Sequence, residues 1–107
     1  MGLYMIKKIS EKDFIKHVEN GISVVDFSAK WCGPCKMLEP VVEEMSEYFD
    51  GKAEFFKIDV DESPRLANQF EIQSIPALVI MRDGKKEDQR IGLQPKESLK
   101  NFIQSYL

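Results

Sequence analysis

Two cysteines dominate the chemistry that this chain can perform. Cys32 and Cys35 are its only cysteines, and both lie in the segment Trp31-Cys32-Gly33-Pro34-Cys35. Two thiols that are two residues apart can close into a disulfide and open again, which makes the pair a two-electron switch. As a structural crosslink the pair would be weak, since closing so short a loop contributes only about 2 kcal/mol. A reactive dithiol is therefore the first hypothesis.

The same spacing also occurs in metal sites, where it supplies two of the ligands. A tetrahedral zinc site usually takes four cysteine or histidine ligands. The chain has one histidine, His17, which lies far from the cysteines in the sequence. A zinc or iron–sulfur site would need ligands from a second subunit, so we expect no bound metal.

Composition limits the kind of protein that this can be. The chain has 107 residues, of which 43% are hydrophobic and 31% are charged, and its net charge is −3. This length and balance predict one soluble globular domain over residues 1–107. The slightly acidic balance argues against a general surface for nucleic acid or anionic lipid. Protein or small-molecule partners fit better, and we expect a monomer.

The N-terminal segment carries no recognisable export signal. Lys7 and Lys8 are followed by no uninterrupted apolar run of signal-peptide length. No stretch approaches the roughly 20 apolar residues of a membrane-spanning helix. We therefore expect a cytoplasmic protein. In a reducing cytoplasm, a lone Cys-x-x-Cys pair is catalytic or metal-binding more readily than structural.

A strand and a helix are predicted on the two sides of the cysteines. Residues 22–27 are nearly all apolar apart from Ser23 and Asp26, as in a central strand that is buried on both faces. After the cysteines, apolar residues recur every three or four positions, which indicates a long amphipathic helix. Pro40 predicts a kink in this helix, and Asp50-Gly51 predicts its end. The predicted apolar face comprises Met37, Leu38, Val41, Val42, Met45, Tyr48 and Phe49, and the solvated face comprises Glu39, Glu43, Glu44 and Glu47.

Turn and cap signals place the remaining elements. Ser10 and Asp13 resemble a capping box, Ser63-Pro64 gives an N-cap followed by proline, and Asp83-Gly84 indicates a tight hairpin. The predicted elements are helices over residues 10–20, 63–70 and from 95, and strands over residues 53–60, 77–81 and 86–92. With a first strand before them, the order β-α-β-α-β-α-β-β-α implies an α/β domain, in which four helices flank a central mixed sheet of five strands.

The segment Trp31-Cys32-Gly33-Pro34-Cys35-Lys36 closely resembles the active site of the thioredoxin family. The resemblance extends over essentially the whole chain, and it implies the thioredoxin fold and a protein-disulfide reductase activity. Thioredoxins commonly carry a tryptophan where this chain has Ser28, which changes the packing behind the active site. The further landmarks are Val25-Asp26-Phe27, Pro40, Lys57-Ile58-Asp59-Val60, Ile75-Pro76, Asp83-Gly84 and Gly92.

The resemblance implies separate roles for the two cysteines, which form the redox-active disulfide Cys32-Cys35. Cys32 is expected at a helix N-terminus, where free backbone N–H groups and the helix dipole stabilise a thiolate, so it is the nucleophile. Cys35 is the resolving thiol, since its attack on the mixed disulfide is intramolecular. Gly33 and Pro34 tune the potential. Pro34 has no N–H to stabilise the thiolate, which suits a reductase, although it is also a residue that favours helix starts.

Asp26 is the most informative residue outside the cysteine motif. A carboxylate in an apolar strand is costly unless it is paired or functional, and burial would raise its pKa. From the residues alone, Asp26 is either catalytic or a strand-end carboxylate that is solvated or caps a turn. The resemblance implies proton transfer to and from Cys35 through water. Lys57 resembles the family lysine near this carboxylate and either tunes it or is an exposed strand residue.

A docking surface for targets is the last feature that the resemblance implies. Ile75-Pro76 resembles the loop that faces the cysteines in thioredoxins, where this proline is cis. The backbone of Ile75 would pair with an extended target segment, as in β-augmentation. Taken singly, Trp31 or Ile91 could equally be a core residue. The expected surface is shallow and mostly apolar and comprises Trp31, Gly33, Pro34, Ile75, Pro76, Ile91 and Gly92.

The resemblance also implies an electron pathway. Thioredoxins bind no cofactor themselves; they receive electrons from NADPH through a flavoprotein, thioredoxin reductase. They pass these electrons to protein disulfides such as those of peroxiredoxin or ribonucleotide reductase. Two other hypotheses remain open at this point. One is a disulfide oxidase or isomerase, and the other is a protein-binding module whose redox chemistry is incidental.

Overall fold

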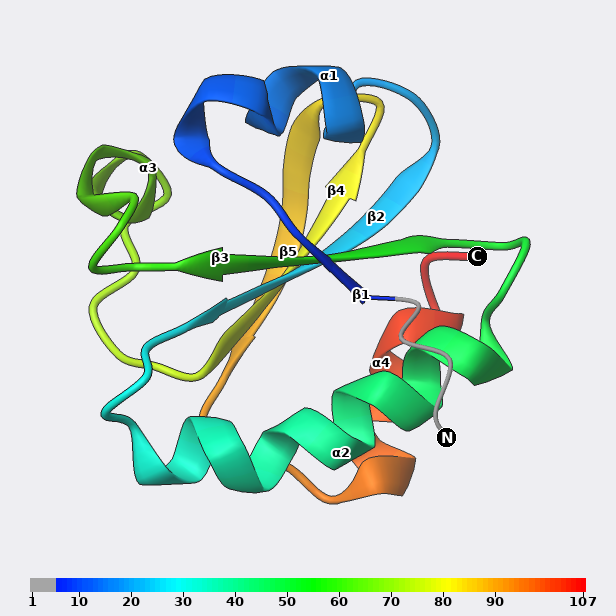
Figure 1. Ribbon diagram of the computed structural model, residues 1–107. Helices are drawn as coiled ribbons and strands as arrows, with labels where there is room; N and C mark the ends of the chain where they lie inside the picture. The colour runs from blue at the N-terminus through cyan, green and yellow to red at the C-terminus, as the bar shows by residue number, and fades with distance from the viewer. Residues whose placement is uncertain (1–5) are drawn as a thin grey trace.

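A five-stranded mixed sheet forms the centre of the computed structural model, which describes residues 6–107 (Figure 1). The strand order is β1-β3-β2-β4-β5, in which β1, β3 and β2 run parallel while β4 and β5 are antiparallel to their neighbours. This confirms the predicted mixed sheet. The strands are β1 (Ile6–Lys8), β2 (Ile22–Ser28), β3 (Glu54–Asp59), β4 (Ala77–Arg82) and β5 (Lys85–Ile91).

Helices cover both faces of the sheet and complete the predicted β-α-β-α-β-α-β-β-α order. α1 and α3 pack on one face, and α2 and α4 pack on the other (Figure 1). The first helix is shorter than predicted, because a 3-10 turn over Glu11–Asp13 precedes it, and the Asp13 carboxylate accepts the backbone N–H of Ser10 at 2.9 Å. The helices are α1 (Phe14–Val18), α2 (Gly33–Tyr48), α3 (Pro64–Gln69) and α4 (Lys96–Gln104).

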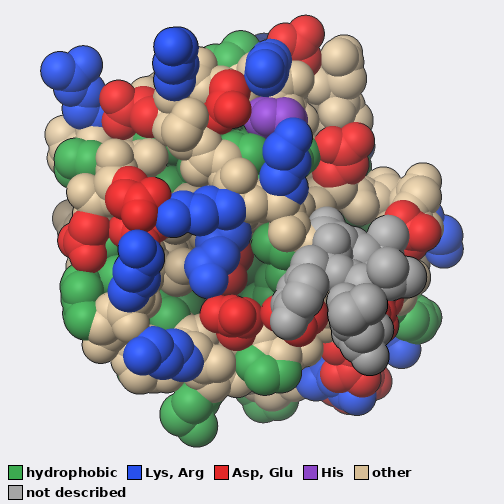
Figure 2. Space-filling model, in the orientation of Figure 1, with side chains coloured by type: hydrophobic (Ala, Val, Ile, Leu, Met, Phe, Trp, Pro, Cys, Tyr) green, Lys and Arg blue, Asp and Glu red, His purple; other side chains and the backbone are tan. Residues whose placement is uncertain are grey.

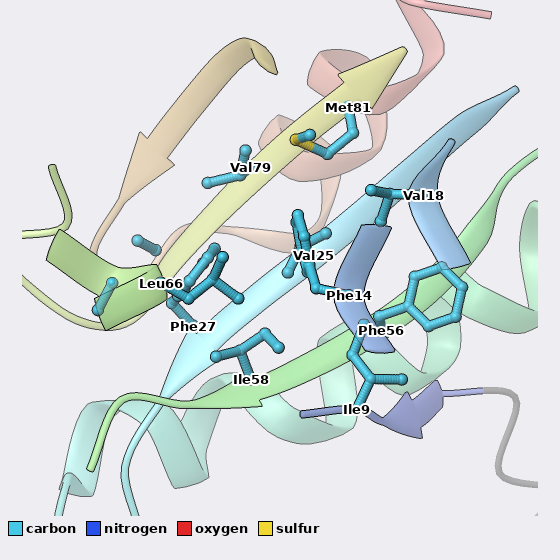
Figure 3. Packing of buried hydrophobic residues seen from close by; sticks show 12 residues of the cluster. Ile9, Phe14, Val18, Val25, Phe27, Phe56, Ile58, Leu66, Val79 and Met81 are labelled. Atoms are coloured by element: carbon cyan, nitrogen blue, oxygen red, sulfur yellow. The ribbon is translucent and has the colours of Figure 1, made fainter. Parts of the chain in front are cut away.

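Strand β2 is buried on both faces, as its apolar sequence predicts. Val25 and Phe27 point into the cluster beneath α1 and α3, which Figure 3 shows. Val24 belongs to the cluster beneath α2 and α4. Since side chains alternate along a strand, Asp26 shares the face of Val24 and lies under the helix that carries the cysteines.

The long helix α2 is amphipathic, but its apolar face is narrower than predicted. Leu38, Val42 and Met45 are buried against the sheet. Met37 and Tyr48 are 65% and 55% exposed, so their assignment to the buried face was wrong. The sheet covers only one side of the helix, and these two residues lie at the margins of the apolar stripe. The helix continues through Pro40, where the predicted kink stays a prediction.

The β4–β5 hairpin and the last helix agree with the turn and cap signals. Asp83 and Gly84 have φ values of 49° and 83°, which are the two positive values that a tight type I′ hairpin requires. Asp83 also joins the hairpin to the start of β2, since its carboxylate accepts the N–H of Gly21 at 2.7 Å. Pro95 is the N-cap residue of α4, whose buried face includes Leu99 and Phe102.

Candidate functional site

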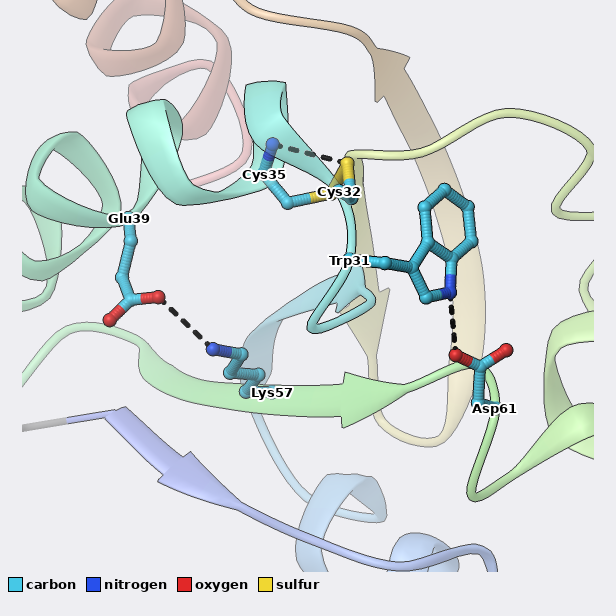
Figure 4. Close-up of a disulfide and its surroundings, with 6 residues drawn as sticks. All are labelled: Trp31, Cys32, Cys35, Glu39, Lys57 and Asp61. Carbon is cyan, nitrogen blue, oxygen red and sulfur yellow. Dashed lines mark hydrogen bonds and ion pairs between the residues drawn. A yellow bond between two sulfur atoms is a disulfide. The ribbon is translucent and has the colours of Figure 1, made fainter.

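The two cysteines lie between the end of β2 and the first turn of α2. Cys32 is the N-cap residue of α2, and Cys35 lies in its first turn. Their sulfur atoms form a disulfide, and their Cα atoms are 5.2 Å apart (Figure 4). The backbone N–H of Cys35 points at the Cys32 sulfur at 3.2 Å. This donor and the helix dipole would stabilise negative charge on Cys32 when the disulfide opens.

The dipeptide Gly33-Pro34 between the cysteines places few groups around the N-terminus of α2. Pro34 occupies the first turn of α2 and has no N–H, so it removes one donor from the group that surrounds the Cys32 sulfur. Gly33 is exposed, and no heavy atom outside its own segment lies within 4 Å of the place where a Cβ would be. Gly33 and Pro34 are therefore open to a partner, while Cys32 and Cys35 themselves are only 4% and 5% exposed.

Asp26 is buried in the middle of β2. The residue is only 5% exposed, and among the described residues its Oδ1 atom has no hydrogen-bond partner. Burial raises the pKa of Asp26 to about 7, while the charge of Lys57 opposes this rise and that of Glu39 adds to it. The alternative of a solvated strand-end carboxylate is excluded. The role in proton transfer stays a prediction.

Lys57 makes an ion pair with a residue that lies 18 positions away in the sequence. It is the register partner of Asp26 on β3, but its Nζ atom bonds to Glu39 Oε2 at 3.2 Å (Figure 4). Glu39, which the sequence predicts on a solvated face, is thus engaged beside the site. The spacing of four residues between Cys35 and Glu39 could have placed Glu39 on the Cys35 side of α2, although it gives no sign of the partner Lys57.

The predicted docking residues gather around the disulfide from three segments. The Ile75-Pro76 peptide bond is cis, and Ile75 packs against the buried cluster of the two cysteines. Gly92 donates its N–H to the carbonyl of Pro76 at 2.8 Å, which brings the end of β5 to this loop. Ile91 is 46% exposed, so the alternative that it is a core residue is wrong.

Trp31 is also on the surface rather than in the core. The residue is 70% exposed, and its Nε1 atom donates to Asp61 Oδ2 at 2.7 Å (Figure 4). Asp61 was not predicted, because the bond joins residues that are 30 positions apart and no local pattern indicates it. This hydrogen bond holds the indole beside the cysteines.

Metal-ligating clusters and membrane-spanning helices are both absent from residues 6–107. In this part of the chain, no three His, Cys, Asp or Glu side chains gather closely enough to hold a metal ion. No helix of the same residues is long and apolar enough to cross a membrane.

Comparison with known proteins decides the family. The Thioredoxin family model matches residues 5–105. Curated thioredoxins from Staphylococcus epidermidis and Staphylococcus aureus are each 46% identical over 102 residues, which cover 95% of this chain and 98% of theirs. A solved mutant thioredoxin from Halobacterium salinarum superposes with a TM-score of 0.83 at 38% identity and covers 99% of this chain and 94% of that one. The chain belongs to the thioredoxin family.

Membership of the thioredoxin family gives the dithiol its chemistry. The enzyme is a disulfide oxidoreductase, and its redox-active pair is Cys32 and Cys35. Members of this family generally hold no cofactor of their own and typically work with a thioredoxin reductase.

Ser28 lines a cleft behind the active site of this thioredoxin. The hydroxymethyl side chain stands at the end of β2, where the family commonly has an indole. A cleft of about 360 Å³ opens between β2, β3 and the first turns of α2. Ser28, Cys35, Glu39 and Lys57 are among its lining residues. Cys35 therefore borders a charged cleft.

Proposed function

We propose that this thioredoxin is a protein-disulfide reductase. It receives electrons from NADPH through a flavoprotein thioredoxin reductase and passes them to protein disulfides, such as those of a peroxiredoxin or a ribonucleotide reductase. The observation that carries the proposal is the disulfide at the N-terminus of α2 with Pro34 between its cysteines. A Cys32 thiolate with few donors is only weakly stabilised, so the dithiol form gives up its electrons readily.

The reaction consists of two exchanges at sulfur. The Cys32 thiolate attacks the target disulfide, and one target sulfur leaves as a thiolate and takes up a proton. The Cys35 thiol then loses its proton, and its sulfur attacks Cys32 to form the disulfide of the structure, which releases the second target thiolate. Two electrons thereby pass from the cysteine pair to the target. The second step is intramolecular, which gives it a large effective molarity.

Asp26 is proposed as the group that exchanges a proton with Cys35, through water. A pKa of about 7 suits this role, since both protonation states are then populated near neutral pH. Lys57 is proposed to tune Asp26, because its charge favours the carboxylate form.

The docking surface is proposed to comprise the apolar and backbone groups around the disulfide. An extended target strand would pair with the backbone of Ile75, and the exposed Trp31 and Ile91 would contact its side chains. The proposed residues are Trp31, Gly33, Pro34, Ile75, Pro76, Ile91 and Gly92. A shallow apolar surface of this kind accepts many different targets.

The setting of this activity is proposed as follows. Residues 1–107 form one domain that acts as a monomer in the cytoplasm, without nucleic acid or membrane partners. Lysine and arginine side chains are mixed with aspartate and glutamate side chains over the face in Figure 2. This mixture of charges supports the proposal that the protein does not bind nucleic acid or anionic lipid through this face.

Reduction of insulin disulfides by NADPH and a thioredoxin reductase tests the proposal. The wild-type protein should support continuous NADPH oxidation, and the Cys32→Ser variant should not. A reduction potential near that of disulfide oxidants, measured against glutathione, would instead favour an oxidase or isomerase. Full activity of a partner protein with both cysteines changed to serine would favour a binding module.

A further inference from the structure

Glu39 is a charged residue that lines the same cleft as Cys35, and its side chain points toward Lys57 (Figure 4). It lies on α2 four residues after Cys35, on the same side of the helix. Its Oε2 atom accepts a hydrogen bond from Lys57 Nζ at 3.2 Å (Figure 4). The Lys57 and Glu39 side chains are 33% and 45% exposed, so the pair contributes little to stability. Its effect on neighbouring groups is the more informative property.

Lys57 lies between two carboxyl groups. On the neighbouring strand β2, its register partner is the buried Asp26. Within residues 6–107, Lys57 forms an ion pair with Glu39 and none with Asp26, whose Oδ1 atom has no hydrogen-bond partner. The half-exposed Glu39 carboxylate therefore holds the Lys57 ammonium group, while the buried Asp26 carboxyl group has no ion-pair partner among these residues.

Of the other charged groups around the cleft, Lys8, Lys30 and Asp59 are bonded to other residues, whereas Lys36 makes no ion pair within residues 6–107. On β4 the register partner of Asp26 is the apolar Leu78. Asp59 on β3 accepts backbone N–H groups from Asp61 and Glu62 at 2.8 and 3.2 Å. Glu62 in turn pairs with two lysines. Lys8 and Lys30 pair with Glu62 at 2.8 and 3.6 Å. The charged residues that line the cleft are Lys8, Lys30, Lys36, Glu39, Lys57 and Asp59.

We propose that Glu39 is a positioning residue for the step in which Cys35 closes the disulfide. It holds the Lys57 ammonium on the solvent side, so that Asp26 can still carry a proton near neutral pH. Its own negative charge acts in the same direction, because it disfavours a second carboxylate nearby. The inference rests on the proton-transfer role proposed above for Asp26.

The proton balance of the step shows what Glu39 changes. Cys35 gives its proton to the Asp26 carboxylate, the Cys35 sulfur bonds to Cys32, and the Cys32 bond to the target sulfur breaks. Reduction of the disulfide runs the same transfer in reverse, with protonated Asp26 as the donor. Without Glu39, Asp26 would remain a carboxylate at lower pH. Closure would then persist at lower pH, and proton donation at neutral pH would weaken.

A symmetric aromatic disulfide that releases a coloured thiolate can follow both steps in one experiment. After rapid mixing with the reduced protein, attack by Cys32 releases the first thiolate, and closure by Cys35 releases the second. The rate of the second phase should fall at acidic pH, where Asp26 is protonated. The Glu39→Gln variant should move the midpoint of this fall to lower pH by about half a pH unit. This is a fraction of the one to three units that a directly adjacent charge causes. One pH unit below the wild-type midpoint, closure should be about threefold faster.

Two variants and a direct titration complete the experiment. Lys57→Met should move the midpoint in the opposite direction. Glu44→Gln is the matched control, because Glu44 lies on the same helix but pairs with Lys96 at 3.1 Å. Carbon-13 NMR of the Asp26 carboxyl in the oxidised protein should show the same shifts of its titration midpoint.

The outcomes separate the inference from the proposed function. If Glu39→Gln leaves both midpoints unchanged, or if Glu44→Gln moves them equally, the inference is wrong while the role of Asp26 stands. If Asp26→Asn gives the wild-type pH profile in the second phase, the proton-transfer role is itself wrong, and the inference is overturned with it.

Discussion

Replacement of Asp26 by asparagine should change how the stability of the oxidised protein depends on pH. Asp26 is 5% exposed, and its burial raises the pKa from 3.8 to about 7. Between these two pH values the folded state binds more protons at this group than the unfolded state. The free energy of unfolding therefore falls as the pH rises through this range, and the loss remains above it. Below pH 3.8 the group contributes no penalty.

The size of the effect follows from the two pKa values. A difference of about 3 between them corresponds to roughly 4 kcal/mol at neutral pH and above. The asparagine side chain of the variant would introduce its own constant cost, because a buried amide needs partners. That cost is the same at every pH. We therefore expect the stability difference between Asp26→Asn and wild type to be about 4 kcal/mol more favourable to the variant at pH 8 than at pH 3.5.

Urea unfolding of the oxidised proteins, followed by far-ultraviolet circular dichroism over this pH range, measures the difference. The dependence of the unfolding free energy on urea concentration should be the same for both proteins, which would show that both unfold from equally compact states. Asp50→Asn, which removes an exposed carboxylate beyond the far end of α2, is the control and should reproduce the wild-type pH dependence. A change below about 1 kcal/mol for Asp26→Asn would refute the desolvation argument.

Three further predictions concern the cysteines and their surroundings. Cys35→Ser should accumulate mixed disulfides with target proteins on non-reducing gels, and Cys32→Ser should not; equal trapping by both would contradict the assigned roles. Pro34→His adds an N–H donor and a cation beside Cys32, which stabilise the thiolate of the reduced form. The reduction potential, measured against glutathione, should therefore rise by about 30–60 mV, the equivalent of one charge-assisted hydrogen bond. An unchanged or lower potential would contradict this. Ser28→Trp would place an indole in the cleft that Ser28 lines. The free energy of unfolding in urea should rise by about 2 kcal/mol, roughly half the value for full burial of an indole. A lower free energy of unfolding would show that the cleft cannot accept the ring.

The elements that position the disulfide could be predicted because local patterns determine them. The apolar run of β2, the period of α2 and the Asp83-Gly84 turn each depend on residues close together in the sequence. Asp26 was conspicuous for the same reason, since a lone carboxylate interrupts an apolar strand. The margins of α2 were predicted less well. Whether Met37 and Tyr48 are covered depends on how far the sheet extends beneath the helix, which helical periodicity does not specify.

The pairings at the site could not be predicted, because they join distant segments. Lys57 meets Glu39 across 18 positions and Trp31 meets Asp61 across 30. Each pair depends on how α2 and the end of β3 are placed by packing, and a lysine near several carboxylates has several possible partners. Ser28 was recognised as unusual, but the cleft that it lines appears only when β2, β3 and α2 are assembled.

The direction in which Lys57 points connects stability with function. Burial of an unpaired Asp26 costs roughly 4 kcal/mol at neutral pH, a large share of the roughly 5–15 kcal/mol that stabilises a typical domain. A cation in register on β3 could offset this cost by pairing with Asp26, yet its ammonium bonds to Glu39 instead. An ion pair with Lys57 would lower the pKa of Asp26 and remove its protonated form at neutral pH. In our proposal, Glu39 thus keeps the protein less stable than it could be and keeps Asp26 able to exchange a proton. Variants that let Lys57 reach Asp26 should gain stability at neutral pH and, in the same proteins, lose proton donation to Cys35.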